Sequence, residues 1–209
     1  MAAQIFVDTR GSCRYWAQQR DEGRQSAMFR DRIGAKHFYP IVDKYDLEIF
    51  NTAGDGYLLG RIKLNDEKKE KTMKDAVLCA MELVARFDEA KEVHELKGPE
   101  SCGVGIAYGE FVTRFVPIFI KTDSSWAPTV DSDAVNRAFF CEQSNKDFNS
   151  AMTIAEEVYH GLKNEKLKKI FSCKYVNFKH EDFSRDVFCA SLDVVKKFYE
   201  EHKENWIAK

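Results

Sequence analysis

The alternation of apolar and polar positions along this chain predicts strands and helices in a regular order. Apolar runs typical of strands lie at residues 5–11, 45–50, 57–62, 102–121 (with a bend at residue 109) and 173–178. Apolar residues at helical spacing predict helices over residues 13–42, 76–87, 130–143 and 192–206. Residues 92–101 and 122–128 are predicted to be loops, and residues 153–159 a strand end that leads into a short helix. The order is strand, helix, strand, strand, helix, strand, with further elements after it.

This order is that of the ferredoxin-like split βαββαβ arrangement, an α+β fold in which helices cover one face of a sheet. In that topology the first strand lies beside the hairpin made by the next two strands. The chain has 209 residues, which is enough for one ordinary domain with a sizeable core. We therefore expect a single domain over residues 1–209, with extra elements after the ferredoxin-like part.

Two aspartates stand at the ends of predicted strands. Asp8 follows the apolar residues Ile5–Val7, and Asp55 lies between two glycines at the tip of the predicted hairpin. Each has an ordinary explanation, because Asp8 can cap a following helix and Asp-Gly is a common hairpin turn. The topology nevertheless brings both carboxylates to one end of the sheet, where they repel each other unless a cation lies between them. The pair therefore predicts a divalent-metal site.

Composition and charge narrow the possible partners. The content of 44% hydrophobic and 32% charged residues is typical of a soluble globular protein, and the net charge of −2 gives no basic field for nucleic acid. No run approaches the ~20 apolar residues that a membrane span needs. Six cysteines without a C-x-x-C pair, and no signal peptide before them, indicate reduced thiols. These observations predict a cytoplasmic protein that binds neither nucleic acid nor membrane.

Five short motifs follow one another between residues 4 and 163. They are an apolar strand with Asp and then Gly (Phe6–Gly11), a Gly-Asp-Gly-Tyr hairpin (Gly54–Tyr57), a Val-Gly-Ile-x-x-Gly strand (Val104–Gly109), a helix with a Val-Asn pair (Asp133–Asn136) and a small-Glu-Glu-Val-Tyr segment (Ala155–Tyr159). In this order and spacing they resemble the catalytic domain of the class III nucleotidyl cyclases. The resemblance implies the class III cyclase fold, with a family-like core over about residues 4–163 and a divergent tail over residues 164–209.

The resemblance also implies a two-metal mechanism. Asp8 and Asp55 would hold two Mn²⁺ or Mg²⁺ ions, and the backbone carbonyl of Thr9 would complete one metal shell. Backbone amides of residues 10–13 would lie against the triphosphate. The implied substrate-binding positions on this side are Phe6, Arg10, Gly11, Ser12 and Cys13. The implied reaction is in-line attack of a ribose 3′-hydroxyl on the α-phosphate, with pyrophosphate as the leaving group.

The positions that read the base depart from the family pattern. Asn51 stands four residues before Asp55, where adenylyl and guanylyl cyclases have Lys or Glu. An amide both donates and accepts hydrogen bonds, so Asn51 can face a pyrimidine edge. The other explanation for Asn51 is a simple hydrogen bonder at a strand end. Thr129 occupies the second base-reading position.

The helix that carries Asn136 departs from the pattern as well. Asn136 would reach the ribose of a nucleotide bound by the other subunit of a head-to-tail homodimer. One turn later the family has a transition-state arginine, whereas this chain has Phe140. Either another cation serves or catalysis is weaker. The cations that could serve are Arg10, Arg137 and Lys179, and Lys179 is also the candidate for binding the triphosphate from the tail.

The altered base-reading positions resemble the pyrimidine cyclases of the Pycsar antiphage systems. This resemblance implies conversion of UTP to 3′,5′-cyclic UMP, with CTP and cyclic CMP as the alternative, and a product that is sensed by a separate effector protein. Three other interpretations stay open. They are an adenylyl or guanylyl cyclase with unusual base contacts, a catalytically silent nucleotide-binding regulator, and a palm-type nucleotidyltransferase.

Overall fold

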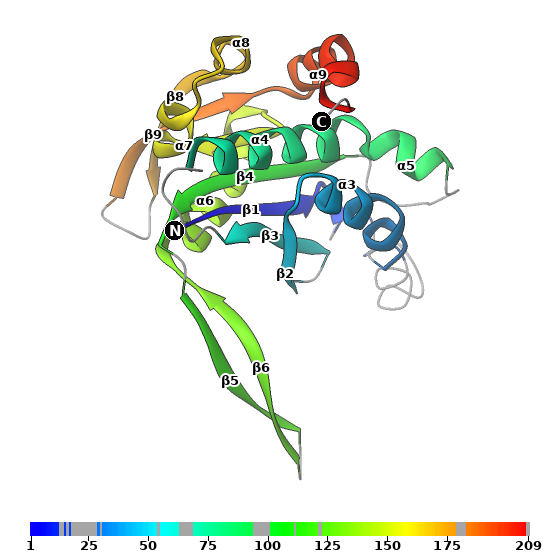
Figure 1. Ribbon diagram of the computed structural model, residues 1–209, viewed down its shortest axis with the longest axis vertical. Helices are drawn as coiled ribbons and strands as arrows, with labels where there is room; N and C mark the ends of the chain where they lie inside the picture. Colours follow the sequence, from blue (N-terminus) through cyan, green and yellow to red (C-terminus); the bar gives the residue numbers. More distant parts are fainter. Residues whose placement is uncertain are drawn as a thin grey trace.

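A computed structural model describes residues 1–12, 15, 17, 29, 31–53, 55–62, 69–93, 101–110, 112–120, 123–178 and 183–207. The helices and strands follow in the order β1 (Ala2–Thr9), η1 (Gly34–Phe38, a π-helix), α3 (Tyr39–Lys44), β2 (Glu48–Ala53), β3 (Gly56–Ile62), α4 (Lys69–Ala85), α5 (Phe87–Val93), β4 (Cys102–Gly109), β5 (Val112–Ile120), β6 (Asp123–Asp131), α6 (Asp133–Phe148), β7 (Met152–Ala155), α7 (Glu156–Gly161), α8 (Glu165–Lys168), β8 (Ser172–Phe178), β9 (Phe183–Ala190) and α9 (Leu192–Ile207). The predicted order of strands and helices is confirmed through β4 (Figure 1).

The described part of the chain forms a seven-stranded sheet in the order β2-β3-β1-β4-β7-β9-β8. β1 pairs antiparallel with both β3 and β4, so the first four strands have the ferredoxin-like order. β7 adds to β4 in parallel, and β9 and β8 extend the sheet antiparallel. The α+β fold with extra C-terminal elements is therefore confirmed, and strands of the divergent tail belong to the same sheet.

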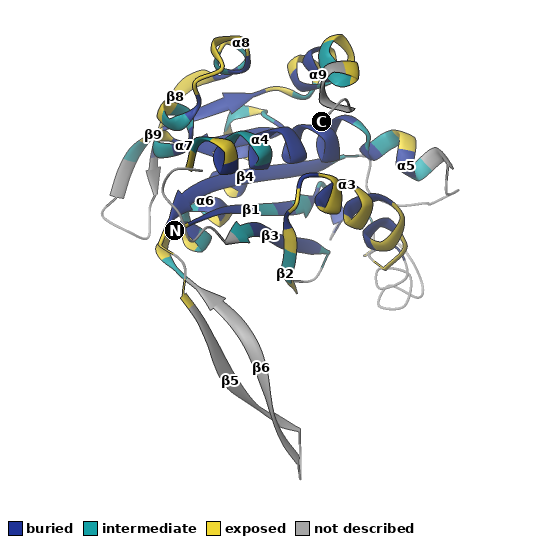
Figure 2. Cartoon of the chain, in the orientation of Figure 1, coloured by how far each residue is buried: buried dark blue, intermediate teal, exposed yellow. Residues whose placement is uncertain are grey.

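Helices cover both faces of this sheet, whereas a ferredoxin-like arrangement alone predicts one. Alternate residues of a strand point to opposite faces. Ile5 and Ile106 belong to the larger hydrophobic cluster, together with the buried side of α4. Ala107, on the other face, packs with Ala138 and Cys141 of α6 in a second cluster. β4 is buried along its whole length between these two layers (Figure 2).

β5 and β6 form a two-stranded antiparallel ribbon that extends away from the body of the molecule (Figure 1). Its ladder runs from the Val112–Asp131 pair to the Ile120–Asp123 pair. The prediction of a loop is therefore wrong over residues 123–128, and residue 122 lies outside the described residues. The segment starts with Asp and two serines, which favour turns, but β5 supplies its ladder hydrogen bonds.

Several boundaries also differ from the predictions. α6 begins at Asp133 and not at residue 130, because Ser132 has extended backbone and its hydroxyl accepts the Val135 N–H at 3.2 Å. α6 then continues to Phe148, where Asn149 in the left-handed conformation ends it. β9 was not predicted. Of the helix predicted over residues 13–42, the described part includes η1 and the start of α3.

Two sequence expectations have structural counterparts. No helix of the described residues is both long and apolar enough to cross a membrane. The five described cysteines are all unpaired, and every one except Cys173 is buried. Burial raises the pKa of the Cys79, Cys102 and Cys141 thiols, so these side chains act as packing groups.

Candidate active site

The two predicted metal-binding aspartates lie at the same end of the sheet. The β1–β3 ladder ends with Val7 opposite Tyr57, which places Asp8 next to the turn that carries Asp55. The Thr9 hydroxyl donates a short hydrogen bond to the Asp55 carboxylate. Both aspartates are half-buried. The convergence that the strand order predicts is therefore present.

The electrostatics of Asp8 fit a cation at this position. Burial raises the pKa of Asp8 and the neighbouring Asp55 carboxylate raises it further, while Lys146, the Thr9 backbone N–H and Arg10 act in the opposite direction. The pKa remains above its ordinary value, so the negative charge is incompletely compensated. Carboxylate and carbonyl oxygens are the ligands that hard divalent ions prefer. No group of three or more His, Cys, Asp and Glu side chains gathers around a metal position among the described residues.

Arg10 crosses from the end of β1 to the face covered by α6. Its Nη2 donates to the Ser150 carbonyl at 3.2 Å and lies 3.6 Å from the Glu142 carboxylate. The guanidinium occupies space that exists only because residue 103 is glycine, since a Cβ on Gly103 would lie 2.2 Å from Nη2. Gly103 is directly opposite Asp8 in the β1–β4 ladder. Cross-strand partners share a face, so the Arg10 guanidinium lies beside Asp8.

Glu142 is a functional candidate that sequence reasoning missed. Its side chain is 0% exposed, and its Oε1 has no hydrogen-bond partner among the described residues. Burial raises the pKa of Glu142, Arg10 opposes this shift, and Asp8 and Asp55 add to it. Glu142 therefore contacts the Arg10 guanidinium and is within electrostatic reach of Asp8 and Asp55. An acidic residue in an amphipathic helix is usually solvated, so its sequence context gave no signal.

α6 runs along β4, and its first and later turns contact different ends of the strand. Ala134 packs against Gly109, and the Glu142 turn packs against Gly105. Asn136 is exposed near the first of these contacts. Asp8 is opposite Gly103, so the carboxylates at the end of β1 lie beyond the second contact and about 20 Å along β4 from Gly109 at the usual rise of a strand. Asn136 and the paired carboxylates of one chain are therefore well separated.

No protein-family model matches this sequence, and no curated protein sequence is significantly similar to it. Solved structures are similar to the chain at low sequence identity. A bacterial light-regulated adenylyl cyclase superposes with a TM-score of 0.65 at 13% identity; the match covers 94% of this chain and 55% of that protein. The adenylyl cyclase CyaB from P. aeruginosa superposes with a TM-score of 0.64 at 15% identity, over 90% of this chain and 92% of that one. The guanylate cyclase domain of RhGC from Catenaria anguillulae, in complex with GTP, superposes with a TM-score of 0.59 at 14% identity, over 90% and 93%.

The fold is that of the adenylyl and guanylyl cyclase domains. Within this cyclase fold, the chain spans about half of the first of these proteins, at 55%, and nearly all of the other two. Sequence identities of 13–15% carry the fold and not the substrate.

The predicted base-reading positions lie on β2 and β6 of the cyclase fold. Asn51 is exposed on β2, next to a shift in the β2–β3 register between Ile49 and Asn51. Its Oδ1 accepts a hydrogen bond from the Thr52 backbone N–H at 2.8 Å. Thr129 lies in β6, opposite Arg114 of β5. Both residues therefore lie on strands, Asn51 on β2 and Thr129 on β6.

The remaining predicted substrate-binding residues surround the end of β1. Phe6 is half-buried, and its ring meets Phe139 of α6 edge-on at 5.2 Å between ring centres. Gly11 is exposed with φ +71°, a conformation that favours glycine, and Ser12 is buried. The predictions for two other positions fall outside the described residues, namely Cys13 and Lys179.

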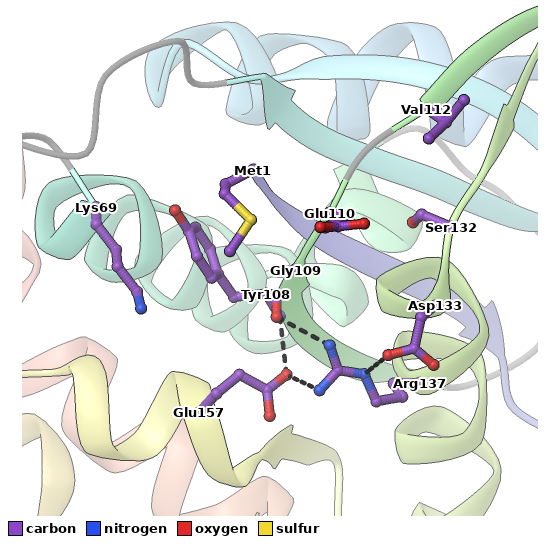
Figure 3. A pocket seen from close by; sticks show the side chains of 10 residues that line it. All are labelled: Met1, Lys69, Tyr108, Gly109, Glu110, Val112, Ser132, Asp133, Arg137 and Glu157. Carbon is purple, nitrogen blue, oxygen red and sulfur yellow. Dashed lines mark hydrogen bonds and ion pairs between the residues drawn. The ribbon is translucent and has the colours of Figure 1, made fainter.

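A cavity of about 450 Å³ lies at the Gly109 end of β4, opposite the end near Asp8 (Figure 3). Arg137 occupies one side of it, with Nη1 2.8 Å from Glu157, Nη2 donating to the Tyr108 carbonyl at 3.0 Å, and Nε 2.8 Å from Asp133. Glu157 also accepts the Tyr108 backbone N–H at 3.1 Å. The Arg137 guanidinium is thus held by two carboxylates and a main-chain carbonyl. The cavity is therefore distinct from the candidate active site, and Arg137 is held away from it.

Proposed function

We propose that this chain is a nucleotidyl cyclase that converts a nucleoside triphosphate to a 3′,5′-cyclic nucleotide and pyrophosphate. The observation that carries the proposal is the meeting of Asp8 and Asp55 at one end of the sheet, within a cyclase fold. Burial and the neighbouring Asp55 carboxylate raise the pKa of Asp8, which is a poor arrangement for stability alone. The same two carboxylates are a good arrangement for binding divalent cations, which the reaction needs.

The residues around Asp8 and Asp55 have distinct roles in this proposal. The two carboxylates and the Thr9 carbonyl hold two Mn²⁺ or Mg²⁺ ions, and the Thr9 hydroxyl orients Asp55. Such ions lower the pKa of a bound hydroxyl and neutralise phosphate charge. The turn at Gly11 would bring the backbone amides of residues 10–12 toward the triphosphate, and the prediction for residue 13 lies outside the described residues.

We propose a homodimer with composite active sites. In one chain Asn136 lies near the Gly109 end of β4, far from Asp8, so a second copy is needed to bring an Asn136 to the carboxylates. Exposed apolar groups at this surface support the same proposal, since Phe139 is 41% and Val112 53% exposed. The β5–β6 ribbon is a second candidate contact, because an isolated two-stranded ribbon is only marginally stable in water.

Mixing two inactive variants tests the composite site. Asp55→Asn and Asn136→Ala would each inactivate both sites of a homodimer. In a heterodimer one site receives both defects and the other receives neither. Equimolar mixing would then restore about a quarter of the wild-type activity per protomer. Failure to restore activity, with heterodimers demonstrated by native mass spectrometry, would contradict shared sites.

The proposed substrate is UTP, and CTP is the alternative. Because the Asn51 carbonyl accepts the Thr52 N–H, the amide nitrogen is the group that can be presented to a base. A donor suits a pyrimidine that carries an oxygen acceptor at position 4, as uracil does, and not the amino donor of cytosine. The resemblance to the Pycsar cyclases extends the proposal to a cyclic UMP signal that a separate effector protein senses in bacterial antiphage defence.

Product analysis tests the proposed reaction. The purified protein is incubated with each of the four ribonucleoside triphosphates and Mn²⁺, and the products are identified by liquid chromatography and mass spectrometry. Cyclic UMP and pyrophosphate in equal amounts are expected, and Asp55→Asn removes both. Cyclic AMP or cyclic GMP as the main product would overturn the pyrimidine assignment. Nucleotide binding without any cyclic product would favour the silent regulator, which Phe140 at the arginine position supports.

A further inference from the structure

We propose that Glu142 and Gly103 are positioning residues that hold the Arg10 guanidinium beside Asp8, where it supplies the cation that Phe140 cannot. This inference rests on the proposed function. It assigns Arg10 to the departing pyrophosphate and gives its two neighbours a purpose. It explains a buried acidic residue and a close approach to glycine that the fold alone does not require.

The first step of the argument is the space around Gly103. The notional Cβ of Gly103 would lie 2.2 Å from Arg10 Nη2 and 2.5 Å from Nε, so the guanidinium lies flat against the strand. Any larger residue at this position would displace it. The opposite residue in the ladder is Asp8. Glycine at residue 103 therefore determines that the arginine lies beside the metal-binding end of β1.

The second step concerns the burial of Glu142. A fully buried carboxylate is weak evidence for stability, because a well-packed apolar residue is often as good or better. Glu142 has one charged neighbour within 4 Å among the described residues, the Arg10 guanidinium at 3.6 Å. Its Oε1 lacks a hydrogen bond there. Its value to the protein is therefore best explained by what it does to Arg10.

The third step is the part of Arg10 that is left for a ligand. Its side chain is 20% exposed, and the contacts to described residues use Nη2 alone. A guanidinium has five N–H donors in a fixed fork and matches phosphate oxygens in pairs. Arg10 and Lys146 also border a cavity of about 200 Å³ on this side. The arginine is thus fixed at one edge and can donate from the other.

Arg137 of α6, another cation that the sequence offered for this role, cannot reach the departing pyrophosphate. Arg137 is held at the opposite end of β4 by Glu157, Asp133 and the Tyr108 carbonyl. Phe140 is apolar and packs edge-on with Phe139, with ring centres 6.0 Å apart. Within the described residues, Arg10 is the arginine next to the paired carboxylates.

The chemistry asked of Arg10 is electrostatic. The ribose 3′-oxygen forms a bond to the α-phosphorus, the bond from that phosphorus to the bridging oxygen breaks, and the hydroxyl proton leaves to solvent. Pyrophosphate departs with the electron pair of the broken bond, so negative charge grows on its oxygens. The Arg10 guanidinium stays protonated throughout and donates hydrogen bonds to these oxygens.

A set of variants tests this role. Gly103→Ala pushes on the guanidinium without changing any charge, and Glu142→Gln removes the charge that holds it. Both should lower kcat by about 10-fold or more with KM for UTP changed less than about 3-fold, the pattern of an interaction made in the transition state. Gly161→Ala is the matched control, because its Cβ would meet another flexible side-chain end, Met73 Cε, at 2.0 Å. That control should keep the wild-type kcat.

A double-mutant cycle separates a positioning role from a merely structural one. In an Arg10→Met background, Gly103→Ala and Glu142→Gln should cause no further loss of kcat, because both act through the missing guanidinium. Further losses of the full single-mutant size would overturn the proposal, as would single variants that match Gly161→Ala. Thermal melting of each variant shows whether it is folded. If Gly103→Ala is unfolded, the Glu142→Gln variant still tests the proposal.

Binding of inorganic pyrophosphate, measured by calorimetry with Mn²⁺ present, distinguishes failure of this inference from failure of the proposed function. Arg10→Met should weaken pyrophosphate binding by about 10-fold, and the Gly103→Ala variant should weaken it similarly. If the wild type makes no cyclic nucleotide but shows this Arg10-dependent binding, the function is wrong and the cation assignment stands. If cyclic nucleotide forms while Arg10→Met binds pyrophosphate as tightly as the wild type, the cation assignment is wrong and the function stands.

Discussion

The two ends of β4 carry similar sets of charged side chains in opposite states of compensation. At the Gly109 end, Arg137 is bound by two carboxylates and a main-chain carbonyl, and Glu157 also accepts a backbone N–H. At the Gly103 end, Arg10 lies 3.6 Å from the buried Glu142, and the pKa of Asp8 is raised by burial and by Asp55. The larger cavity lies at the compensated end. Uncompensated charge, and not cavity volume, therefore marks the candidate active site.

This difference has a physical cost that only function explains. Burying a carboxylate without hydrogen bonds lowers the stability of a fold, and selection retains such groups where a ligand compensates them. Glu142 is fully buried and its Oε1 has no hydrogen bond among the described residues, although Gln143 donates to its Oε2 at 3.3 Å. Glu157 differs, because each of its contacts supports the end of β4. The two ends should consequently respond to substitution in opposite ways.

The largest contrast is expected between Asp55→Asn and Glu157→Gln. Asp55→Asn should lower cyclase activity by at least about 100-fold while the melting temperature stays level or rises, because it removes a repulsion along with a metal ligand. Glu157→Gln should leave activity within about 3-fold and lower the melting temperature, because Arg137 loses one of its two carboxylate partners. Rates from product analysis and melting curves check the pair. Equal losses of activity would contradict the separation of the two ends.

The second contrast compares two glycines of β4. A Cβ on Gly105 would lie 2.0 Å from the Ala138 carbonyl oxygen and 2.3 Å from the Glu142 backbone nitrogen, neither of which can move without α6. Gly105→Ala should therefore lower the free energy of unfolding by about 3 kcal/mol or more. Gly103→Ala meets only the flexible end of Arg10, so its loss should be much smaller. Urea unfolding of both variants checks this, and a loss for Gly103→Ala as large as that for Gly105→Ala would refute it.

The pairing of Asp8 with Asp55 could be predicted from sequence because it depends on strand order alone. Apolar runs fix the strands, a Gly-Asp-Gly turn fixes the hairpin, and the ferredoxin-like order then fixes which strand ends meet. The side chains need not be placed for this inference. Local sequence patterns that specify the topology are therefore sufficient to predict that the two carboxylates meet.

Glu142 and β6 could not be predicted, for two different reasons. Glu142 lies in a helix with other charged residues, and it is buried because Gly105 lets α6 approach β4 closely. That approach is a property of tertiary packing. β6 has polar residues and Pro128, and it becomes a strand only because β5 folds back along it. In both cases the deciding partner is distant in space or belongs to the neighbouring strand.

The third prediction concerns the compensated end alone. Arg137→Met removes the ion pairs with Glu157 and Asp133 and the hydrogen bond to the Tyr108 carbonyl. It should lower the free energy of unfolding by about 2 kcal/mol, mostly because the half-buried Glu157 loses its cation. If Arg137 instead served the transferred phosphate, kcat would fall with little change in stability. Urea unfolding and initial rates, measured on the same preparation, distinguish these outcomes.

The smallest expected effect is on stability, which the ionised carboxylates of two buried glutamates should change in opposite directions. Burial alone would raise the pKa of Glu82, but hydrogen bonds from Lys44, Tyr45 and Arg86 lower it below the ordinary 4.5. Ionised Glu82 therefore contributes stability above pH 4.5, and this contribution is lost as the pH falls through the lowered pKa. Burial raises the pKa of Glu142, with Arg10 opposing, so ionised Glu142 costs stability at neutral pH and the cost disappears in acid.

Substitution by glutamine should expose these opposite signs. In metal-free buffer at pH 7, Glu82→Gln should lower the free energy of unfolding by about 2 kcal/mol and Glu142→Gln should raise it by about 1 kcal/mol. The Glu142→Gln difference should shrink toward zero near pH 4, where that carboxyl is protonated in the folded and unfolded states, whereas the Glu82→Gln difference should decrease only as the pH falls through the lowered pKa of Glu82. Urea unfolding at the two pH values measures them. A stabilising role for ionised Glu142 would give both variants the same sign, and the acidic residue beside Arg10 would then be part of the scaffold and not of the active site.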